Sequence, residues 1–428
     1  MNGTAPLGSP APSALAPVLE RERLVTLDVL RGFALLGVCV ANVWLWFSGI
    51  AFRMPGYRDE LLQLSLDSVV FHAIGILVSG KAISTFSFLF GLGFAIQMLR
   101  AEARGRSVVP LYLRRLLVLL LIGVAHMTLL WYGDILTAYA MLGFLLLLFR
   151  RRSDRTLLVW AAILLGGLPL VMAGLPLALA LPDPNLAEIA QRNAATLAVF
   201  QHGSYAEIVR ENLHQAGKFY LGRKAPWLFY SLGLFVLGLY VGRRRIFEDV
   251  DGHRGLFRRI VVWGLPIGLA GNIAGGVMQM AITPDVMLAD PRLMFLMSLV
   301  FVGSTIPLAA GYVCAATLLL QREGASRWLL HFAPPGRMAL TNYLSQTVIM
   351  LLIFYPYGGG LIGRTGPAAA LGVALTVFAV QMVWSRLWLA YFQFGPMEWV
   401  WRTLTYGRLQ PMRIGRTPAP APKVATGL

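Results

Sequence analysis

Apolar runs of membrane length recur along the whole chain, and they constrain its fold more than any other feature. A run of about 17 to 25 mostly apolar residues can cross the hydrocarbon core of a bilayer as a helix. Counting such runs predicts about ten spans, at residues 27–49, 83–99, 111–131, 134–149, 157–181, 226–242, 257–281, 293–320, 338–356 and 367–393. The predicted fold class is therefore an all-α polytopic membrane protein.

Composition argues against the main alternative, a soluble globular domain. Charged residues make up only 13% of the 428 residues and hydrophobic residues 57%, whereas soluble domains carry roughly 25% charged residues. The net charge of +17 suggests nucleic acid as a partner at first, but the basic residues concentrate in the loops between the apolar runs. We therefore expect membrane lipid around the chain and no nucleic-acid partner. The two cysteines, Cys39 and Cys314, lie inside apolar runs, so no disulfide framework is expected.

The distribution of basic residues predicts how the chain is oriented in the membrane. Cytoplasmic loops of membrane proteins carry an excess of lysine and arginine. When alternate loops are assigned to the inner side, most of the 37 basic residues fall there, with dense clusters at 100–115, 150–155 and 243–259. One missed span would destroy this alternation. The pattern predicts a multi-pass protein of the bacterial inner membrane with both termini in the cytoplasm.

The same reading divides the chain into three parts. Residues 1–22 are rich in proline, alanine and serine and are expected to form a disordered cytoplasmic tail. Residues 23–395 form the transmembrane helical domain, and 396–428 are expected to be a basic cytoplasmic tail.

Two segments predicted to face outward are long and amphipathic. In residues 50–82, the stretch Asp67–His72 could form a helix at the membrane interface. Residues 183–225 carry an apolar stripe that predicts an amphipathic helix on the outer membrane surface. Its members are Tyr205, Ile208, Val209, Leu213, Ala216 and Tyr220.

Ionisable residues inside membrane spans are costly, so they are candidates for function. Asp28 and Arg31 lie three residues apart in the first span and hence on one helical face. One interpretation is a local ion pair with an arginine that fixes the topology. The other is that Arg31 contacts an anionic ligand from the cytoplasm, because a guanidinium stays charged and binds phosphate through a planar fork.

His126 is the histidine predicted to lie deepest in a span. It precedes the Trp131–Tyr132 pair, which is expected at the outer interface, by a distance of about 7 Å along a helix. The imidazole could simply hydrogen-bond a neighbouring helix. It could also act as a general base, since histidine exchanges a proton near neutral pH. Asp134 could orient this imidazole or serve as the N-cap of the fourth span.

A polar stripe opens the ninth span, where Asn342 and Gln346 lie four residues apart on one face. Such a stripe either joins helices through hydrogen bonds or lines a polar cavity. The pair Gly91 and Gly93 more plausibly permits close helix contact than phosphate binding. The histidines and cysteines lack metal-ligand spacing, so no metal cofactor is expected.

The motifs around these residues resemble a known family. The stretches LDVLRGFALLG at 27–37, SFLFGLGFA at 87–95, GVAHMTLLWYGD at 123–134 and GRMALTNYLSQ at 336–346 match the YeiB-like proteins, which carry the domain of unknown function 418. The resemblance covers nearly the whole chain, residues 23–413. The first-span motif is also similar to the transmembrane acyltransferase superfamily. That group includes acyltransferase-3 proteins, glucan succinyltransferases and the lysosomal heparan-glucosaminide acetyltransferase.

The superfamily resemblance implies transfer of an acyl group from cytoplasmic acyl-CoA to an extracytoplasmic sugar or lipid acceptor. In acyltransferase-3 proteins an arginine is followed, after ten intervening residues, by a histidine. Arg31 matches the arginine, but Asn42 stands at the histidine position and cannot act as a general base. Arg115 and His126 are also eleven residues apart, about 16 Å along a helix. We therefore hypothesise that the third span supplies the histidine.

The leading prediction is a transmembrane acyltransferase, with roles divided among named residues. The expected donor site consists of Arg31, Arg114 and Arg115, with Asp28 beside them; the catalytic pair is His126 and Asp134; and the path or carbonyl-binding residues are Asn42, Asn342 and Gln346. A transporter of a small anionic or amphiphilic molecule is the second hypothesis, and a lipid- or quinone-binding protein is the third. An internal repeat would favour a transporter, and none stands out. Oligomerisation stays open.

Overall fold

The computed structural model describes residues 24–54, 57–105, 107–167, 170–171, 174, 185–221, 226–282, 286 and 290–414. Over these ranges the secondary structure is helical, apart from one isolated antiparallel bridge between Phe392 and Arg413. The expected tail at 1–22, most of the second half of the expected span 157–181 and the last residues of the expected basic tail lie outside the described residues. The prediction of an all-α chain is confirmed for the described part.

Six helical segments in the described ranges are long and apolar enough to cross a membrane. A seventh results if the bent pair Glu323–Arg337 and Ala339–Phe354 counts as one span. Two shorter apolar helices, Leu136–Phe149 and Trp227–Arg243, also occur. The six segments are Val25–Arg53, Leu66–Glu102, Val109–Leu129, Arg254–Ala281, Phe295–Leu320 and Pro367–Tyr391. The count of about ten spans stays a prediction.

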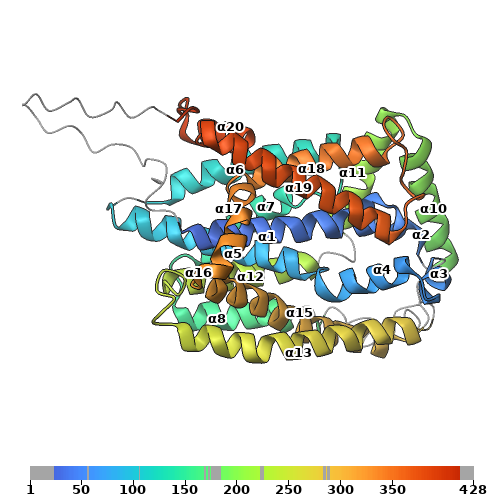
Figure 1. Cartoon of the computed structure of the whole chain (residues 1–428), viewed down its shortest axis with the longest axis horizontal. Helices are drawn as coiled ribbons and strands as arrows, with labels where there is room; N and C mark the ends of the chain where they lie inside the picture. Colours follow the sequence, from blue (N-terminus) through green and yellow to red (C-terminus); the bar gives the residue numbers. More distant parts are fainter. Residues whose placement is uncertain are drawn as a thin grey trace, which may run out of the picture.

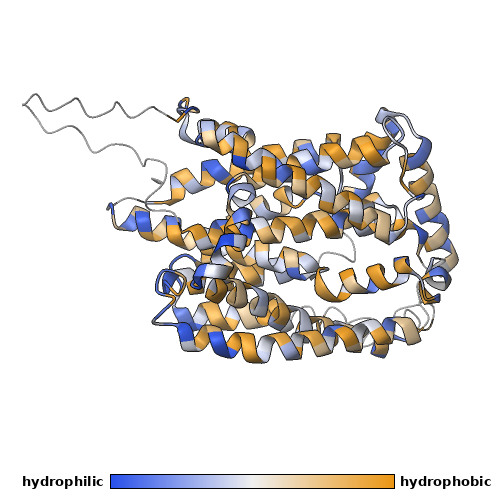
Figure 2. Cartoon of the chain, viewed as in Figure 1, coloured by the Kyte–Doolittle hydropathy of each residue, from blue (hydrophilic) through white to orange (hydrophobic). Residues whose placement is uncertain are grey.

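The outer surface of the long helices is apolar. Trp263 on α13 (Arg254–Ala281) is 67% exposed, and Leu121 on α6 (Val109–Leu129) is 62% exposed. Hydrophobic residues predominate along the length of the bundle, whereas hydrophilic residues gather at its two ends (Figure 2). Soluble monomers rarely expose apolar patches of this extent. The surface therefore fits a hydrocarbon environment.

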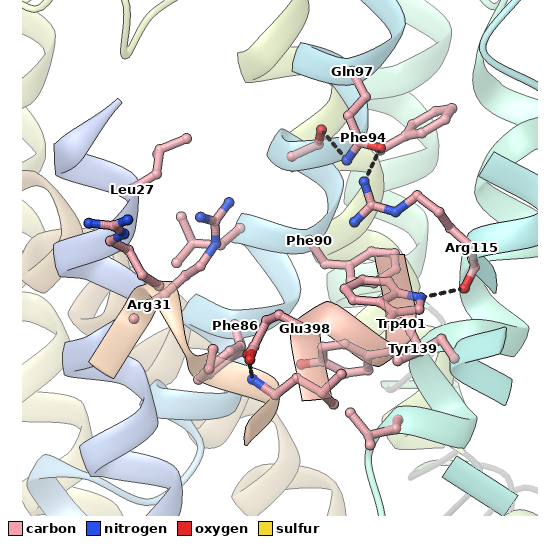
Figure 3. Close-up of a pocket in the computed structure, with 18 of the residues that line it drawn as sticks. Leu27, Arg31, Phe86, Phe90, Phe94, Gln97, Arg115, Tyr139, Glu398 and Trp401 are labelled. Carbon is pink, nitrogen blue, oxygen red and sulfur yellow. Dashed lines mark hydrogen bonds between the residues drawn. The ribbon is translucent and has the colours of Figure 1, made fainter. Parts of the chain in front are cut away.

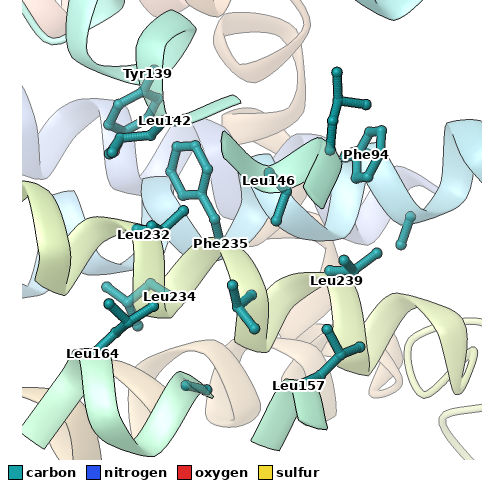
Figure 4. Close-up of a cluster of buried hydrophobic side chains, with 14 of the residues drawn as sticks. Phe94, Tyr139, Leu142, Leu146, Leu157, Leu164, Leu232, Leu234, Phe235 and Leu239 are labelled. Carbon is teal, nitrogen blue, oxygen red and sulfur yellow. The ribbon is translucent and has the colours of Figure 1, made fainter. Parts of the chain in front are cut away.

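The core of the bundle forms where α5 (Lys81–Glu102) crosses α12 (Pro226–Arg243). A Cβ atom at Gly91 would overlap the backbone carbonyl of Phe235, and one at Gly238 would overlap that of Phe88. The two backbones therefore touch, as the helix-contact interpretation of Gly91 predicted. Buried apolar side chains of α5, α7 (Leu136–Leu146), α8 (Asp154–Ala162) and α12 fill the space around this crossing (Figure 4).

A second close crossing places the start of α1 (Val25–Asn42) against the short helix α17 (Ala333–Arg337). A Cβ atom at Gly336 would overlap the carbonyl oxygen of Asp28, and one at Gly32 would overlap that of Phe332. Only glycine allows this approach. After α17 the chain turns by 78° into α18 (Ala339–Phe354). The crossing thus brings Arg337 and the start of α18 beside Asp28 and Arg31.

The first and last described residues lie at the same end of the bundle, on the left in Figure 1. We call it the inner end, as the charge distribution predicts. Residues 396–414 do not extend freely there. Instead α20 (Pro396–Tyr406) folds back onto α6 and α18, and Gln393 N donates to Met412 O at 2.9 Å. Part of the segment expected to be a tail is thus an element of the fold.

The segment 50–82 differs from its prediction. It contains α2 (Ile50–Arg53), α3 (Arg58–Leu62) and α4 (Leu66–Leu77). Helix α4 contacts α13 and α19 (Pro367–Tyr391) and runs nearly in line with α5 (Figure 1). Asp67–His72 therefore belongs to a membrane-length segment, Leu66–Glu102, rather than to a helix across the surface. The other helices of the described ranges are α15 (Pro291–Leu320), α16 (Glu323–Leu329), the π-helices η2 (Val43–Phe47) and η4 (Ile163–Gly167), and the 3-10 helices η3 (Leu147–Phe149) and η5 (Leu330–Phe332).

The outer end is covered by α10 (Leu186–His202) and α11 (Tyr205–Leu221). The buried stripe of α11 is Ile208, Asn212 and Ala216, while Tyr205 and Leu213 are about half exposed. Asn212 Nδ2 donates to the carbonyl oxygens of Thr128 and Leu130, 3.4 and 3.1 Å away. These hydrogen bonds satisfy backbone carbonyl groups that have no partner within the last turn of α6.

The pair Trp131–Tyr132 was expected at the lipid interface, but both side chains are buried under this cover. Tyr132 stacks on Phe200 of α10, with ring centroids 5.9 Å apart.

Candidate functional site

A cavity of about 340 Å³ lies at the inner end of the bundle. Helices α1, α5, α6, α7, α18 and α20 contribute its wall, together with Arg337 and Gly336 of α17 (Figure 3). Both halves of the chain therefore contribute to one site.

The part of the wall nearest the inner end is rich in positive charge. It contains five arginines, Arg31, Arg100, Arg115, Arg337 and Arg402, and two carboxylates, Asp28 and Glu398. Because a protein interior has a low effective dielectric constant, the excess of guanidinium groups attracts an anion more strongly than the same charges would in water.

The structure shows the local ion pair that one interpretation of Arg31 predicted. Its Nη1 donates to Asp28 Oδ1 at 2.8 Å, so the local ion pair exists. The side chain also lines the cavity, where its guanidinium faces Gly93 of α5. The ion pair thus holds Arg31 at the site without removing it from the cavity.

Arg115 is held by contacts from two other helices. Its Nη1 donates to Gln97 Oε1 at 2.6 Å, and its guanidinium stacks on the Trp401 ring, 4.5 Å from the centroid. The indole of Trp401 in turn donates to the carbonyl oxygen of Arg115 at 2.9 Å (Figure 3). Arg114 is exposed and is not among the described residues that line the cavity. Adjacent helical residues point about 100° apart, so only one of the pair can face inward.

Glu398 was not identified from the sequence, because residues 396–428 were expected to be a tail. Its carboxylate accepts hydrogen bonds from Leu340 N at 2.7 Å, Thr341 N at 3.1 Å and Thr341 Oγ1 at 2.5 Å. It therefore caps the start of α18. Burial raises the pKa of Glu398, and the hydrogen bonds from Thr341 partly oppose this effect. The sequence does carry a signal that a helix starts here. Gly395 and Pro396 are followed by an acidic residue, Glu398, in the first turn.

Deeper in the bundle the wall becomes apolar and aromatic. It includes Phe86, Phe90, Leu119, Tyr139 and Tyr343, and Phe90 and Tyr139 pack edge to face, with centroids 5.5 Å apart. The cavity is thus amphiphilic, with arginines near the inner end and an apolar interior.

Behind Tyr343 lies a buried hydrogen-bonded trio, His126, Asp134 and Thr347. His126 Nδ1 lies 2.9 Å from Asp134 Oδ1, and His126 Nε2 lies 2.9 Å from Thr347 Oγ1. Asp134 Oδ2 also accepts a hydrogen bond from Thr137 N at 2.6 Å, and this bond caps the start of α7. Asp134 therefore has both of its expected contacts. The Tyr343 and His126 rings are 5.3 Å apart, but His126 is not among the described residues that line the cavity.

The three residues expected to line the path lie elsewhere. Asn342 Nδ2 donates to Ser385 Oγ at 2.9 Å, and Gln346 Nε2 donates to Gln381 Oε1 at 2.8 Å, so both join α18 to α19. This is the helix-joining interpretation of the stripe. Asn42 is half-buried at the end of α1 and does not face the cavity wall described above.

Lys81 was assigned to an outward loop, yet the structure buries it at the start of α5. Its Nζ donates to Asn272 Oδ1 at 2.5 Å and to Gly75 O at 3.1 Å. Sequence reasoning missed it because the break between α4 and α5 resembled a loop. Among the residues that the structure describes, no group of three or more histidine, cysteine, aspartate or glutamate side chains could hold a metal ion.

Helices of membrane length around an internal cavity define a class, the polytopic α-helical membrane proteins. Within it, residues 241–408 match the family described as "Protein of unknown function (DUF418)". The chain is 34% identical to the uncharacterized protein YxaH of Bacillus subtilis over 418 residues, which cover 94% of this chain and 98% of YxaH. It is 28% identical to the uncharacterized protein YeiB of Escherichia coli over 392 residues, 90% of this chain and 96% of YeiB.

The chain therefore belongs to the YeiB-like DUF418 family, as the motifs predicted. The matched segment 241–408 includes Arg337, Thr347 and Glu398. The similarity to YxaH extends over almost the full length, so it also includes the helices that carry Arg31 and His126.

Proposed function

We propose that this protein is an acyltransferase of the bacterial inner membrane, which uses cytoplasmic acyl-CoA to acylate an acceptor on the outer side. The observation that carries the proposal is the amphiphilic cavity. Acyl-CoA combines anionic phosphates with an apolar acyl chain, and the cavity presents arginines and an apolar interior in the same order. The other end of the bundle then receives a sugar or lipid hydroxyl.

The donor site uses the arginines that neighbouring side chains hold in place. Arg31 is fixed by Asp28, and Arg115 is fixed by Gln97 and Trp401. Guanidinium groups held in this way bind phosphate oxygens with little further loss of side-chain entropy. Arg114 takes no part, in contrast to the sequence-based prediction, because it faces away from the cavity.

The acyl chain occupies the apolar interior between Phe86, Phe90 and Tyr139, so the thioester points toward Tyr343 and the histidine behind it. His126 removes the proton of the attacking hydroxyl, and Asp134 stabilises the imidazolium that forms. Asn42, Asn342 and Gln346 hold no substrate in this proposal, since Asn342 and Gln346 bond to α19 and Asn42 is not among the described residues of the cavity wall.

A binding measurement tests the donor site. Purified protein in nanodiscs is titrated with a thioether analogue of dodecanoyl-CoA, which cannot transfer its acyl group. We expect saturable binding that weakens strongly in Arg31→Ala and only in part in Arg31→Lys, because an ammonium lacks the bidentate fork. Arg114→Ala is the matched control and should bind like the wild type. Equal affinity of wild type and Arg31→Ala, or no binding to the wild type, contradicts the proposal.

Transport of an amphiphilic anion is the second candidate, and one observation favours it. The 78° turn between α17 and α18 breaks a membrane segment beside the cavity, and broken helices form the binding sites of many transporters. The two functions differ in product. An acyltransferase releases free CoA and leaves the acyl group on an acceptor, whereas a transporter delivers its ligand unchanged across proteoliposome membranes.

A further inference from the structure

The trio His126, Asp134 and Thr347 has the geometry of a hydroxyl–imidazole–carboxylate relay. The two hydrogen bonds are 2.9 Å each, they engage opposite nitrogens of one imidazole, and all three side chains are buried. The residues come from three elements, α6, the turn before α7, and α18. A threonine hydroxyl occupies the place that a nucleophilic serine has in a catalytic triad.

The tautomer follows from the hydrogen-bond partners. An ionised carboxylate only accepts hydrogen bonds, so His126 Nδ1 must carry the proton that faces Asp134. In that tautomer Nε2 is an acceptor, 2.9 Å from the hydroxyl of Thr347; the carbonyl oxygen of Tyr343 is a second, more distant acceptor for this hydroxyl at 3.5 Å. When Thr347 donates to the nearer acceptor, Nε2, its proton faces a base, and a neutral hydroxyl becomes a nucleophile in this way.

Resting on the proposed acyl transfer, we infer that Thr347 is a catalytic nucleophile that carries the acyl group between donor and acceptor. Thr347 Oγ1 attacks the thioester carbon, its proton passes to His126 Nε2, and the carbon–sulfur bond breaks. The thiolate of CoA takes the proton and leaves as free CoA. The acceptor hydroxyl then attacks the threonyl ester, His126 takes the acceptor's proton and returns one to Thr347, and the acylated acceptor departs.

The position of the trio fits an intermediate carrier. The arginines of the cavity wall lie near the inner end, whereas His126 lies in the last turn of α6, toward the outer end. The donor binds near the arginines and the acceptor binds at the outer side. If a side chain between them carries the acyl group, the two substrates need not come into contact.

Tyr343 separates the trio from the donor cavity. Its ring lines the cavity wall, lies one helical turn before Thr347 on α18 and contacts the His126 ring. Its hydroxyl accepts a hydrogen bond from Ile135 N at 3.3 Å, and Ile135 is itself in the cavity wall next to Asp134 in the chain. In this inference the Tyr343 side chain must move for the thioester to reach Thr347, because its ring lies between the cavity and the trio.

Acylation without an acceptor tests the inference. Full-length protein in nanodiscs is incubated with dodecanoyl-CoA, free CoA is measured, and the intact protein and its peptides are weighed by mass spectrometry. Cys39→Ala and Cys314→Ala are introduced first so that thiols cannot take the acyl group. We expect one equivalent of CoA and one acyl group per protein, on the peptide that contains Thr347 and stable to neutral hydroxylamine, as an oxygen ester is.

Three variants give the controls. Thr347→Val keeps the side-chain shape and should lose acylation, whereas Thr347→Ser should retain it. Thr317→Val removes another buried threonine hydroxyl, which donates only to Val313 O in α15, and should be acylated like the wild type. Binding of the thioether analogue shows that each variant is folded.

The outcomes separate this inference from the proposed function. If wild-type protein binds the analogue but carries no acyl group on Thr347, the carrier role is wrong and direct transfer by His126 stands. Acylation that persists in Thr347→Val has the same consequence. If the wild type does not bind the analogue at all, the proposed function fails and the carrier role fails with it.

Discussion

The donor cavity and the buried trio both place ionisable side chains inside a helical bundle, but they do so in opposite ways. The cavity collects five arginines against two carboxylates and keeps open volume between them. The trio gives each of its polar atoms a partner at hydrogen-bond distance. Buried polar groups are stable in this second arrangement, since their desolvation is offset by hydrogen bonds.

The difference indicates how the two regions can act. A site with excess charge of one sign gains free energy when a ligand of the opposite sign enters, so it suits binding. A satisfied network gains nothing from a ligand, but a proton can move along it at low cost because the partners are already aligned. We therefore assign binding to the inner end and chemistry to the outer half, and the predictions below test that division.

The largest expected effect concerns the side of the membrane on which each end of the bundle lies. Single cysteines at Ser204, between α10 and α11, and at Gly252, before α13, are introduced after Cys39 and Cys314 are replaced. In intact cells a membrane-impermeant thiol reagent should label Ser204→Cys and leave Gly252→Cys unlabelled, because basic loops stay in the cytoplasm. Permeabilised cells, in which both positions should react, provide the control. The reverse pattern in intact cells would place the cavity mouth on the outer side.

His126→Ala should reduce turnover by about 10²- to 10⁴-fold, the usual range for loss of a general base. Affinity for the thioether analogue should change little, because His126 does not touch the donor cavity. His126→Asn is the second variant, since its amide can still donate to Asp134 and so preserves the fold. If either variant loses donor binding and turnover together while remaining folded, the two regions are not separable.

Arg115→Ala should weaken binding of the acyl-CoA analogue by roughly 10- to 100-fold, the value of one charge-assisted hydrogen bond. Arg114→Ala, one residue away and exposed, should change it by less than about twofold. Isothermal titration on protein in nanodiscs measures both. Equal effects of the two substitutions would mean that general surface charge, rather than the cavity, attracts the ligand.

The smallest effect concerns Glu398, which belongs to the wall of the cavity but acts on α18. Glu398→Ala should lower the free energy of unfolding by about 1 kcal/mol, because two backbone N–H groups lose their cap. Glu398→Gln should be nearly neutral, since an amide oxygen still accepts these bonds and burial already raises the pKa of the carboxyl group. Thermal unfolding in detergent compares them. If Glu398→Gln lowers the free energy of unfolding as much as Glu398→Ala does, the charge of the carboxylate is needed for stability.

Much of the architecture was predictable from local sequence features. Apolar runs and basic loops are properties of consecutive residues, so they identified the helical membrane class, and they predict which end of the bundle is the inner one. The Asp28–Arg31 contact was also predictable, because residues three apart share a helical face. The motifs assigned the chain to its family, and the comparison with YxaH confirms that assignment.

Other features depended on contacts between distant segments. The sequence could not tell which of Arg114 and Arg115 faces inward, because the rotation of α6 is fixed by its neighbours. It suggested a tail where α20 folds back, since the apolar face of α20 is short and packs against α6 and α18, which are distant in the sequence. Lys81 was misplaced for a similar reason, because its acceptor Asn272 lies on another helix.

The sequence by itself determined the helical membrane class, the family and the identity of His126 as the histidine to test, since these depend on composition and spacing along the chain. Only the tertiary structure brought Thr347 to the imidazole and Trp401 to Arg115, across separations of 221 and 286 residues. Hydrogen bonds and ring contacts act over a few ångströms. Helix crossings decide which side chains come that close, and order in the chain does not. An example is the crossing at which Gly32 and Gly336 allow two helix backbones to touch.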